Sequence, residues 1–119
     1  MIVADASALF EVLDGASGGA RIEARLFARP EPVCVPHLVD AEIAHVLRKH
    51  TLARRISEAR AQAALQDYLD LALVRFAHAS LLPRVFALRH TMTAYDALYV
   101  ALAESLNATL VTCDGRLAR

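Results

Sequence analysis

The fold is decided near the N-terminus, by the stretch Ile2-Val3-Ala4-Asp5-Ala6-Ser7-Ala8-Leu9. Its first three residues are a short apolar run of the kind found in buried strands. The run stops at an acid, Asp5, and the residues from 7 to 13 then follow a helical pattern. The stretch therefore predicts a buried strand that passes at once into a helix, with a carboxylate at the junction.

The same alternation continues along the chain. Further apolar strands are predicted at residues 33–35, 73–76 and 109–112, and helices at residues 20–28 and 38–49. Three more helices are expected to begin at the capping residues Ser57, Ser80 and Thr93, the last of them ending at about Leu106, before Asn107. Strands that alternate with helices predict βαβ units, and so an α/β fold with a parallel sheet. The 119 residues suffice for one such domain and are too few for two.

The amino-acid composition favours a globular protein over a membrane protein or a pure nucleic-acid binder. Hydrophobic residues make up 56% of the chain, enough to cover both faces of a buried sheet and to supply an oligomer interface. The 13 basic and 13 acidic residues cancel, which disfavours a pure nucleic-acid binder but not an enzyme that touches RNA transiently. No stretch is long enough to span a membrane and the N-terminus lacks the positive region of a signal peptide, so we expect a cytoplasmic protein. The two cysteines, Cys34 and Cys113, lack metal-ligand spacing and are expected to be reduced.

Four acidic residues fall where a parallel sheet would gather them. Asp5 and Asp114 each follow a predicted strand, at the end where such sheets bind ligands. Glu42 and Asp96 lie on predicted helices, next to apolar residues. Each has an ordinary explanation alone: Asp5 as a helix cap, Asp96 in a capping box with Thr93, Asp114 in a turn and Glu42 on an exposed helix face.

Taken together, the four acids favour a metal site. Carboxylates gathered at one edge of a sheet repel one another, which costs stability and raises at least one pKa. A divalent cation would remove that repulsion, and Mg²⁺ is typically held by a few carboxylates and several waters. The sequence therefore predicts a magnesium site built from three or four carboxylates.

The sequence lacks the residues that a zinc site, a phosphate-binding loop or a catalytic triad would need. The chain has no Cys/His set for zinc, and His37 and His45 are too far apart to form the H-E-x-x-H motif. The glycines within residues 15–19 lack the lysine of a phosphate-binding loop. Ser7 has no histidine and aspartate partners at spacings that suggest a catalytic triad.

These segments resemble those of the VapC-type PIN-domain toxins, the ribonuclease halves of bacterial toxin–antitoxin pairs. The matching segments are residues 2–9, 35–43, 88–104 and 110–114, in the order of the family. The specific part is the block Tyr95-Asp96-Ala97-Leu98-Tyr99-Val100-Ala101-Leu102-Ala103, followed by Thr112-Cys113-Asp114.

The resemblance implies a site and a reaction. It assigns the metal ligands, which are also the catalytic residues, to Asp5, Glu42, Asp96 and Asp114. The ion would be Mg²⁺, which Mn²⁺ can replace. The hydroxyls of Ser7 and Thr112 would support the carboxylates without binding the ion themselves. The reaction implied is metal-assisted hydrolysis of an RNA phosphodiester. Arg89 and Arg116 are candidate phosphate contacts, although arginines of this kind are often ordinary solvated surface.

The resemblance also implies a fold and partners. The family has a parallel sheet in the order 3-2-1-4-5, flanked by helices, and residues 1–119 would form one PIN-like domain that lacks the C-terminal edge strand. In that order Cys34 and Cys113 would lie two strands, roughly 10 Å, apart, too far for a disulfide. The expected partners are RNA, a small VapB-like antitoxin that blocks the site, and a second copy of the chain in a homodimer.

Two other functional classes remain open at this point. One is a catalytically inactive PIN module that only binds an antitoxin. The other is a phospho-receiver-like signalling domain, which needs a lysine beyond its phosphoacceptor, whereas the only lysine here is Lys49, on an early helix. A dehalogenase-like phosphatase would need Asp-x-Asp at the first strand, where this chain has Ser7 as the third residue.

Overall fold

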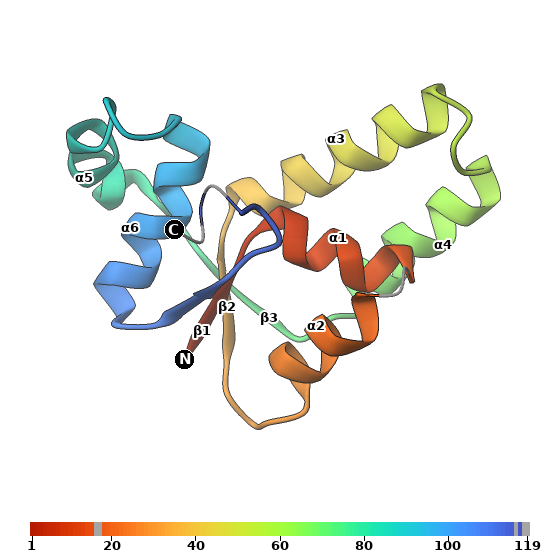
Figure 1. Ribbon diagram of the computed structural model, residues 1–119, viewed down its shortest axis with the longest axis horizontal. Helices are drawn as coiled ribbons and strands as arrows, with labels where there is room; N and C mark the ends of the chain where they lie inside the picture. Colours follow the sequence, from red (N-terminus) through yellow and green to blue (C-terminus); the bar gives the residue numbers. More distant parts are fainter. Residues whose placement is uncertain (16–17, 116, 118–119) are drawn as a thin grey trace.

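A parallel sheet forms the centre of the molecule (Figure 1). The computed structural model describes residues 1–15, 18–115 and 117. Within these residues the sheet has four strands in the order β3-β2-β1-β4. They are β1 (Ile2–Ala4), β2 (Val33–Pro36), β3 (Leu73–Phe76) and β4 (Thr109–Val111). The parallel pairing is as the sequence pattern predicted, and the order 3-2-1-4 is as the family resemblance implied. All four strands lie within one residue of their predicted bounds.

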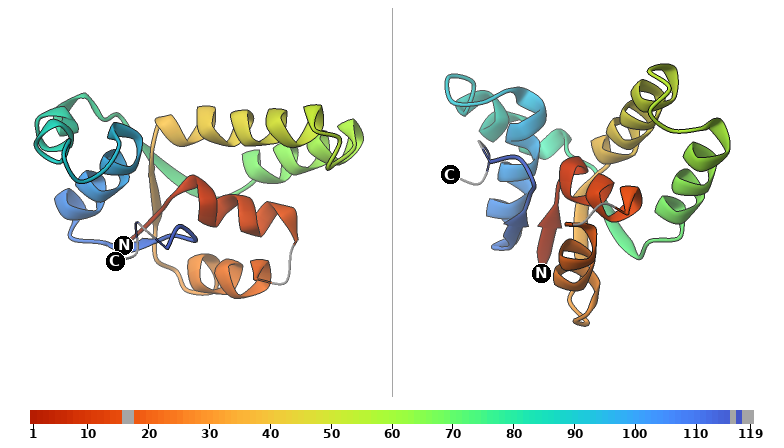
Figure 2. Two further views of the ribbon diagram at one scale, coloured as in Figure 1. Left: turned by 45° about the horizontal axis from the view of Figure 1, so that its top comes forward. Right: turned by 45° about the vertical axis from the view of Figure 1, so that its right-hand side comes forward.

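Helices pack on both sides of this sheet. They are α1 (Ala6–Asp14), α2 (Gly19–Phe27), α3 (Leu38–Leu52), α4 (Glu58–Leu69), α5 (Leu82–Ala87) and α6 (Ala94–Leu106). Figure 2 shows α5 and α6 on one side and α1 and α2 on the other, while α3 and α4 form a hairpin that projects from the sheet. None of the helices within the described ranges is both long and apolar enough to cross a bilayer.

The helix ends follow the predicted capping, with one exception. The hydroxyls of Ser57 and Thr93 accept the backbone N–H groups that open α4 and α6, at 3.0 and 3.2 Å. The predicted cap at Ser80 is wrong, because residues 79–81 form a 3₁₀ turn and α5 begins after Leu81 without a side-chain cap. Pro83 explains the difference, since its fixed φ angle and missing N–H suit the first turn of a helix.

The central strand β1 is fully buried, with all three of its residues at 0% exposure. It lies between β2 and β4, so its side chains meet helices on either face, including Leu9 of α1 and Tyr99 of α6 in the same core. Such burial on both faces is the reason for its uninterrupted apolar sequence. Cys34 and Cys113 are free thiols, the first buried and the second exposed.

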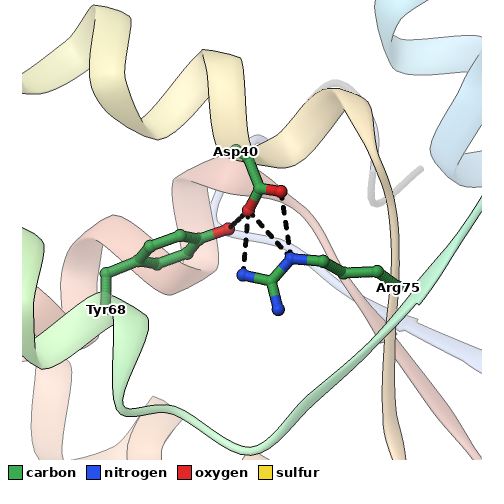
Figure 3. Close-up of polar contacts among 3 residues, drawn as sticks. All are labelled: Asp40, Tyr68 and Arg75. Carbon is green, nitrogen blue, oxygen red and sulfur yellow. Dashed lines mark hydrogen bonds and ion pairs between the residues drawn. The ribbon is translucent and has the colours of Figure 1, made fainter.

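A polar cluster ties α3 to α4 and to β3 (Figure 3). Asp40, in the first turn of α3, accepts the Tyr68 hydroxyl at 2.5 Å and the guanidinium of Arg75 at 2.9 to 3.1 Å. The Arg75 guanidinium also lies 5.8 Å from the centre of the Tyr68 ring. The hydrogen bonds from Arg75 hold the pKa of Asp40 below its usual range. The cluster fixes the start of α3 on the side that faces α4.

We expect Tyr68→Phe to lower the free energy of unfolding by about 1.5 kcal/mol, at the low end for a hydrogen bond to a charged acceptor. The ring is 2% exposed and would keep its packing, while Asp40 would keep Arg75. Urea unfolding of both proteins measures the difference. A variant with the same unfolding midpoint as the wild type would show that the hydroxyl contributes nothing to α3.

Candidate active site

Asp5 lies at the junction of β1 and α1 and is only 5% exposed. Its Oδ1 accepts the backbone N–H of Ala8 at 3.0 Å and the hydroxyl of Ser7 at 2.7 Å. Its Oδ2 accepts the hydroxyl of Thr112, which follows β4. Asp5 is therefore the N-cap of α1, as a capping role alone would predict. In addition, both of its carboxylate oxygens accept hydrogen bonds.

Ser7 and Thr112 join the ends of two neighbouring strands. The Ser7 hydroxyl accepts the backbone N–H of Cys113 at 2.9 Å and lies 3.3 Å from the Thr112 hydroxyl. The Thr112 hydroxyl in turn accepts the backbone N–H of Asp114 at 2.9 Å. The segment after β4 is thus fastened to the end of β1, which brings Asp114 to the edge of the sheet that carries Asp5.

Glu42 reaches the same edge from α3. Its Oε1 accepts a hydrogen bond from the hydroxyl of Tyr99, a residue of α6 that is 2% exposed. Burial raises the pKa of Glu42 above its usual value, the negative charges of Asp5 and Asp96 raise it further, and the hydrogen bond from Tyr99 opposes them. Burial, followed by the bond to Glu42, raises the pKa of Tyr99 far above that of a free phenol, so Tyr99 is the donor.

Asp96 lies in the first turn of α6, which starts at the same end of the sheet as α1 and α3 (Figure 1). The cap of this helix is Thr93, whose hydroxyl accepts the Asp96 backbone N–H. Among the described residues no hydrogen bond to the Asp96 carboxylate is found. A capping box also needs this side chain to accept the backbone N–H of Thr93, so that explanation is only half met. The carboxylate is half-buried and acts on Glu42 through its charge.

The residues that suit a metal ion here carry only oxygen donors. Over the described ranges, no three His, Cys, Asp or Glu side chains stand close enough together to hold an ion as they are, so a cation would have to draw the carboxylates inward. The repulsion that Asp5 and Asp96 exert on Glu42 is the kind that a divalent cation relieves. Carboxylate oxygens are also the ligands that Mg²⁺ prefers, so the donor set fits that ion. The four-ligand cluster itself stays a prediction.

Of the two arginines predicted to contact RNA, only Arg89 lies within the described residues. Arg89 is exposed, donates to the carbonyl of Phe86 at 3.0 Å and lies 4.4 Å from the centre of its ring. It lines a surface groove of about 360 Å³ together with Thr93, the cap of the helix that carries Asp96. Arg116 lies outside the described residues. Tyr99 was given no role by sequence reasoning, although a tyrosine among the apolar residues of a helix's buried face indicates a hydroxyl that needs a partner.

Comparison with known proteins covers nearly the whole chain. The PIN domain family model matches residues 2–119. Ribonuclease VapC9 of Mycobacterium tuberculosis is 44% identical over 120 residues, which span 99% of this chain and 89% of the relative. Ribonuclease VapC1 of the same organism is 43% identical over 117 residues, 98% of this chain and 87% of the relative.

Solved structures support the same fold. The VapBC2 structure from Rickettsia felis, bound to a DNA fragment from its promoter, aligns with a TM-score of 0.72 at 20% identity, over 100% of this chain and 92% of the other. VapC20 of M. tuberculosis, a toxin that cleaves the sarcin-ricin loop, gives a TM-score of 0.67 at 20% identity, over 99% and 93%. Together with the sequence identities, these matches show that the chain belongs to the PIN-domain family, among its VapC ribonucleases.

Proposed function

We propose that this chain is the toxin of a toxin–antitoxin pair and hydrolyses RNA phosphodiesters with a divalent cation, Mg²⁺, held by Asp5, Glu42, Asp96 and Asp114. The observation that carries the proposal is the way Asp5 and Glu42 are held at one edge of the sheet, each by hydrogen bonds from neighbouring elements. Burial and the nearby charges of Asp5 and Asp96 raise the pKa of Glu42 there. Its context is the identity with VapC ribonucleases along nearly the full chain. A phospho-receiver domain gains no support from these relatives.

The chain's own residues would prepare the site for such an ion. When bound, the cation supplies Lewis-acid stabilisation of charge on the phosphate and an activated water nucleophile. Asp5 cannot reorient freely, because Ser7, Ala8 and Thr112 already hold both of its oxygens. A carboxylate fixed in this way needs no rearrangement during the reaction, which is the benefit of a preorganised site. Mn²⁺ takes the same oxygen ligands, so we expect it to replace Mg²⁺.

The partners we propose follow from the same site. RNA phosphates would lie near Arg89 and Arg116, which precede Asp96 and follow Asp114 in the sequence. A small VapB-like antitoxin would block the site with a basic side chain, since an arginine fork matches a cluster of carboxylates. We further propose that the toxin acts in the cytoplasm as a homodimer.

The first test of the metal site is a thermal melt of wild type and Asp96→Asn. In EDTA we expect the variant to melt at the same temperature as wild type or higher, because removing one charge relieves repulsion. Millimolar Mg²⁺ or Mn²⁺ should raise the wild-type melting temperature, because a bound cation stabilises the folded state. When the cation concentration is a hundred times its dissociation constant, this stabilisation is about 2.7 kcal/mol. The variant should respond less.

Glu104→Gln is the matched control for this melt. Glu104 lies on the same helix, near its other end, and forms a surface ion pair with Arg84 at 2.8 Å. Surface pairs contribute little, so this variant should keep the metal response of the wild type. A destabilised Asp96→Asn protein, together with a wild type that ignores metal, would mean that the carboxylates do not form a site.

The activity test is cleavage of a structured RNA by the same proteins. We expect wild type and Glu104→Gln to cleave with Mg²⁺ and to stop in EDTA, and Asp96→Asn and Glu42→Gln to lose at least a hundredfold in rate. Asp5→Asn is less informative, because the Asp5 carboxylate also caps α1 and binds Thr112. A folded wild type that binds metal but leaves RNA intact would favour the inactive antitoxin-binding module.

A further inference from the structure

Helix α3 carries two carboxylates, and each accepts a hydrogen bond from a buried tyrosine. Tyr68 of α4 donates to Asp40, and Tyr99 of α6 donates to Glu42. Both tyrosines are 2% exposed. Because successive residues of an α-helix are about 100° apart, Asp40 and Glu42 point to nearly opposite sides of α3. One tyrosine therefore holds the side of the helix away from the candidate site, and the other holds the side that faces it.

The bond from Tyr99 restricts how Glu42 can lie. The Tyr99 ring is enclosed in the main core, next to β1 and β2, so its hydroxyl has little freedom to move. The hydroxyl occupies Oε1 of Glu42. Among the described residues no hydrogen bond to Oε2 is found, and Asp5 and Asp96 are the acids whose charges act on this carboxylate.

We propose that Tyr99 is a positioning residue for the metal site: its hydroxyl holds Oε1 of Glu42, so that Oε2 is presented to a divalent cation shared with Asp5 and Asp96. The inference rests on the proposed function. Without the hydroxyl, Glu42 would have to give up free side-chain rotation each time a cation binds. Hydrogen-bond partners behind a metal ligand typically contribute 10- to 100-fold in metal affinity or activity.

Tyr99→Phe tests the proposal, because it removes only the hydroxyl and leaves the ring. Tyr68→Phe is a closely matched control, since it removes a buried hydroxyl from the other carboxylate of the same helix. The readout that does not depend on RNA is the dissociation constant for Mn²⁺, followed by electron paramagnetic resonance on folded protein. We expect Tyr99→Phe to weaken Mn²⁺ binding 10- to 100-fold. We expect Tyr68→Phe to leave it within twofold, because the bonds from Arg75 to Asp40 still anchor α3 in that variant.

RNA cleavage across a range of Mg²⁺ concentrations provides the second readout. For Tyr99→Phe we expect a higher half-saturating Mg²⁺ concentration, with the maximal rate largely restored when Mg²⁺ saturates. In Glu42→Ala, which removes the oxygen that accepts the Tyr99 hydroxyl, adding Tyr99→Phe should cost no further Mn²⁺ affinity, because residues that act through one contact are not additive. Additive losses, or a Tyr99→Phe protein within twofold of wild type for Mn²⁺, would overturn the inference.

The two proposals fail in different ways. If wild type binds Mn²⁺ and Tyr99→Phe binds it at least tenfold more weakly, but neither cleaves RNA, the proposed function is wrong and the role of Tyr99 stands. If wild type binds no Mn²⁺ at millimolar concentration, both are overturned.

Discussion

The site depends first on the hydrogen bonds that meet at the Asp5 carboxylate. A buried aspartate is costly unless its oxygens are satisfied, and here Ala8, Ser7 and Thr112 supply the donors. These bonds begin α1, and they fasten the segment after β4 to the end of β1. The same contacts that make the charge tolerable in the interior thus also fix the edge of the sheet at which the metal site is proposed.

Helix α3 shows how such a site can be held without contacting it. The Asp40 cluster ties one side of the helix to α4 and β3, while Glu42 occupies the other side. A shift of α3 along its axis would have to break bonds on both sides at once. The position of α3 against the sheet therefore also sets the position of Glu42. A shift is disfavoured because it would leave buried polar groups without their partners, which is costly.

Much of this was predictable from the sequence, for identifiable reasons. The apolar run that ends at Asp5 predicted a buried strand, because strands buried on both faces have few other compositions. The alternation of strands with helices predicted the parallel pairing. The bond between Glu42 and Tyr99 was not predictable, since it joins residues 57 positions apart and depends on how α3 and α6 pack. The start of α5 was mispredicted at Ser80, because Pro83 was a stronger signal for the first turn than a serine.

The bond between Asp5 and Thr112 spans 107 positions of the chain. Contacts of such long sequence separation form only after a large loop has closed, and they slow folding accordingly. During synthesis, a nascent chain that has not yet reached β4 lacks one of the donors to Asp5 and the whole segment that carries Asp114. The hydrogen bonds that hold Asp5 are thus complete only after β4 has been made, and a ribosome that has not yet translated β4 carries a chain in which the proposed site cannot form.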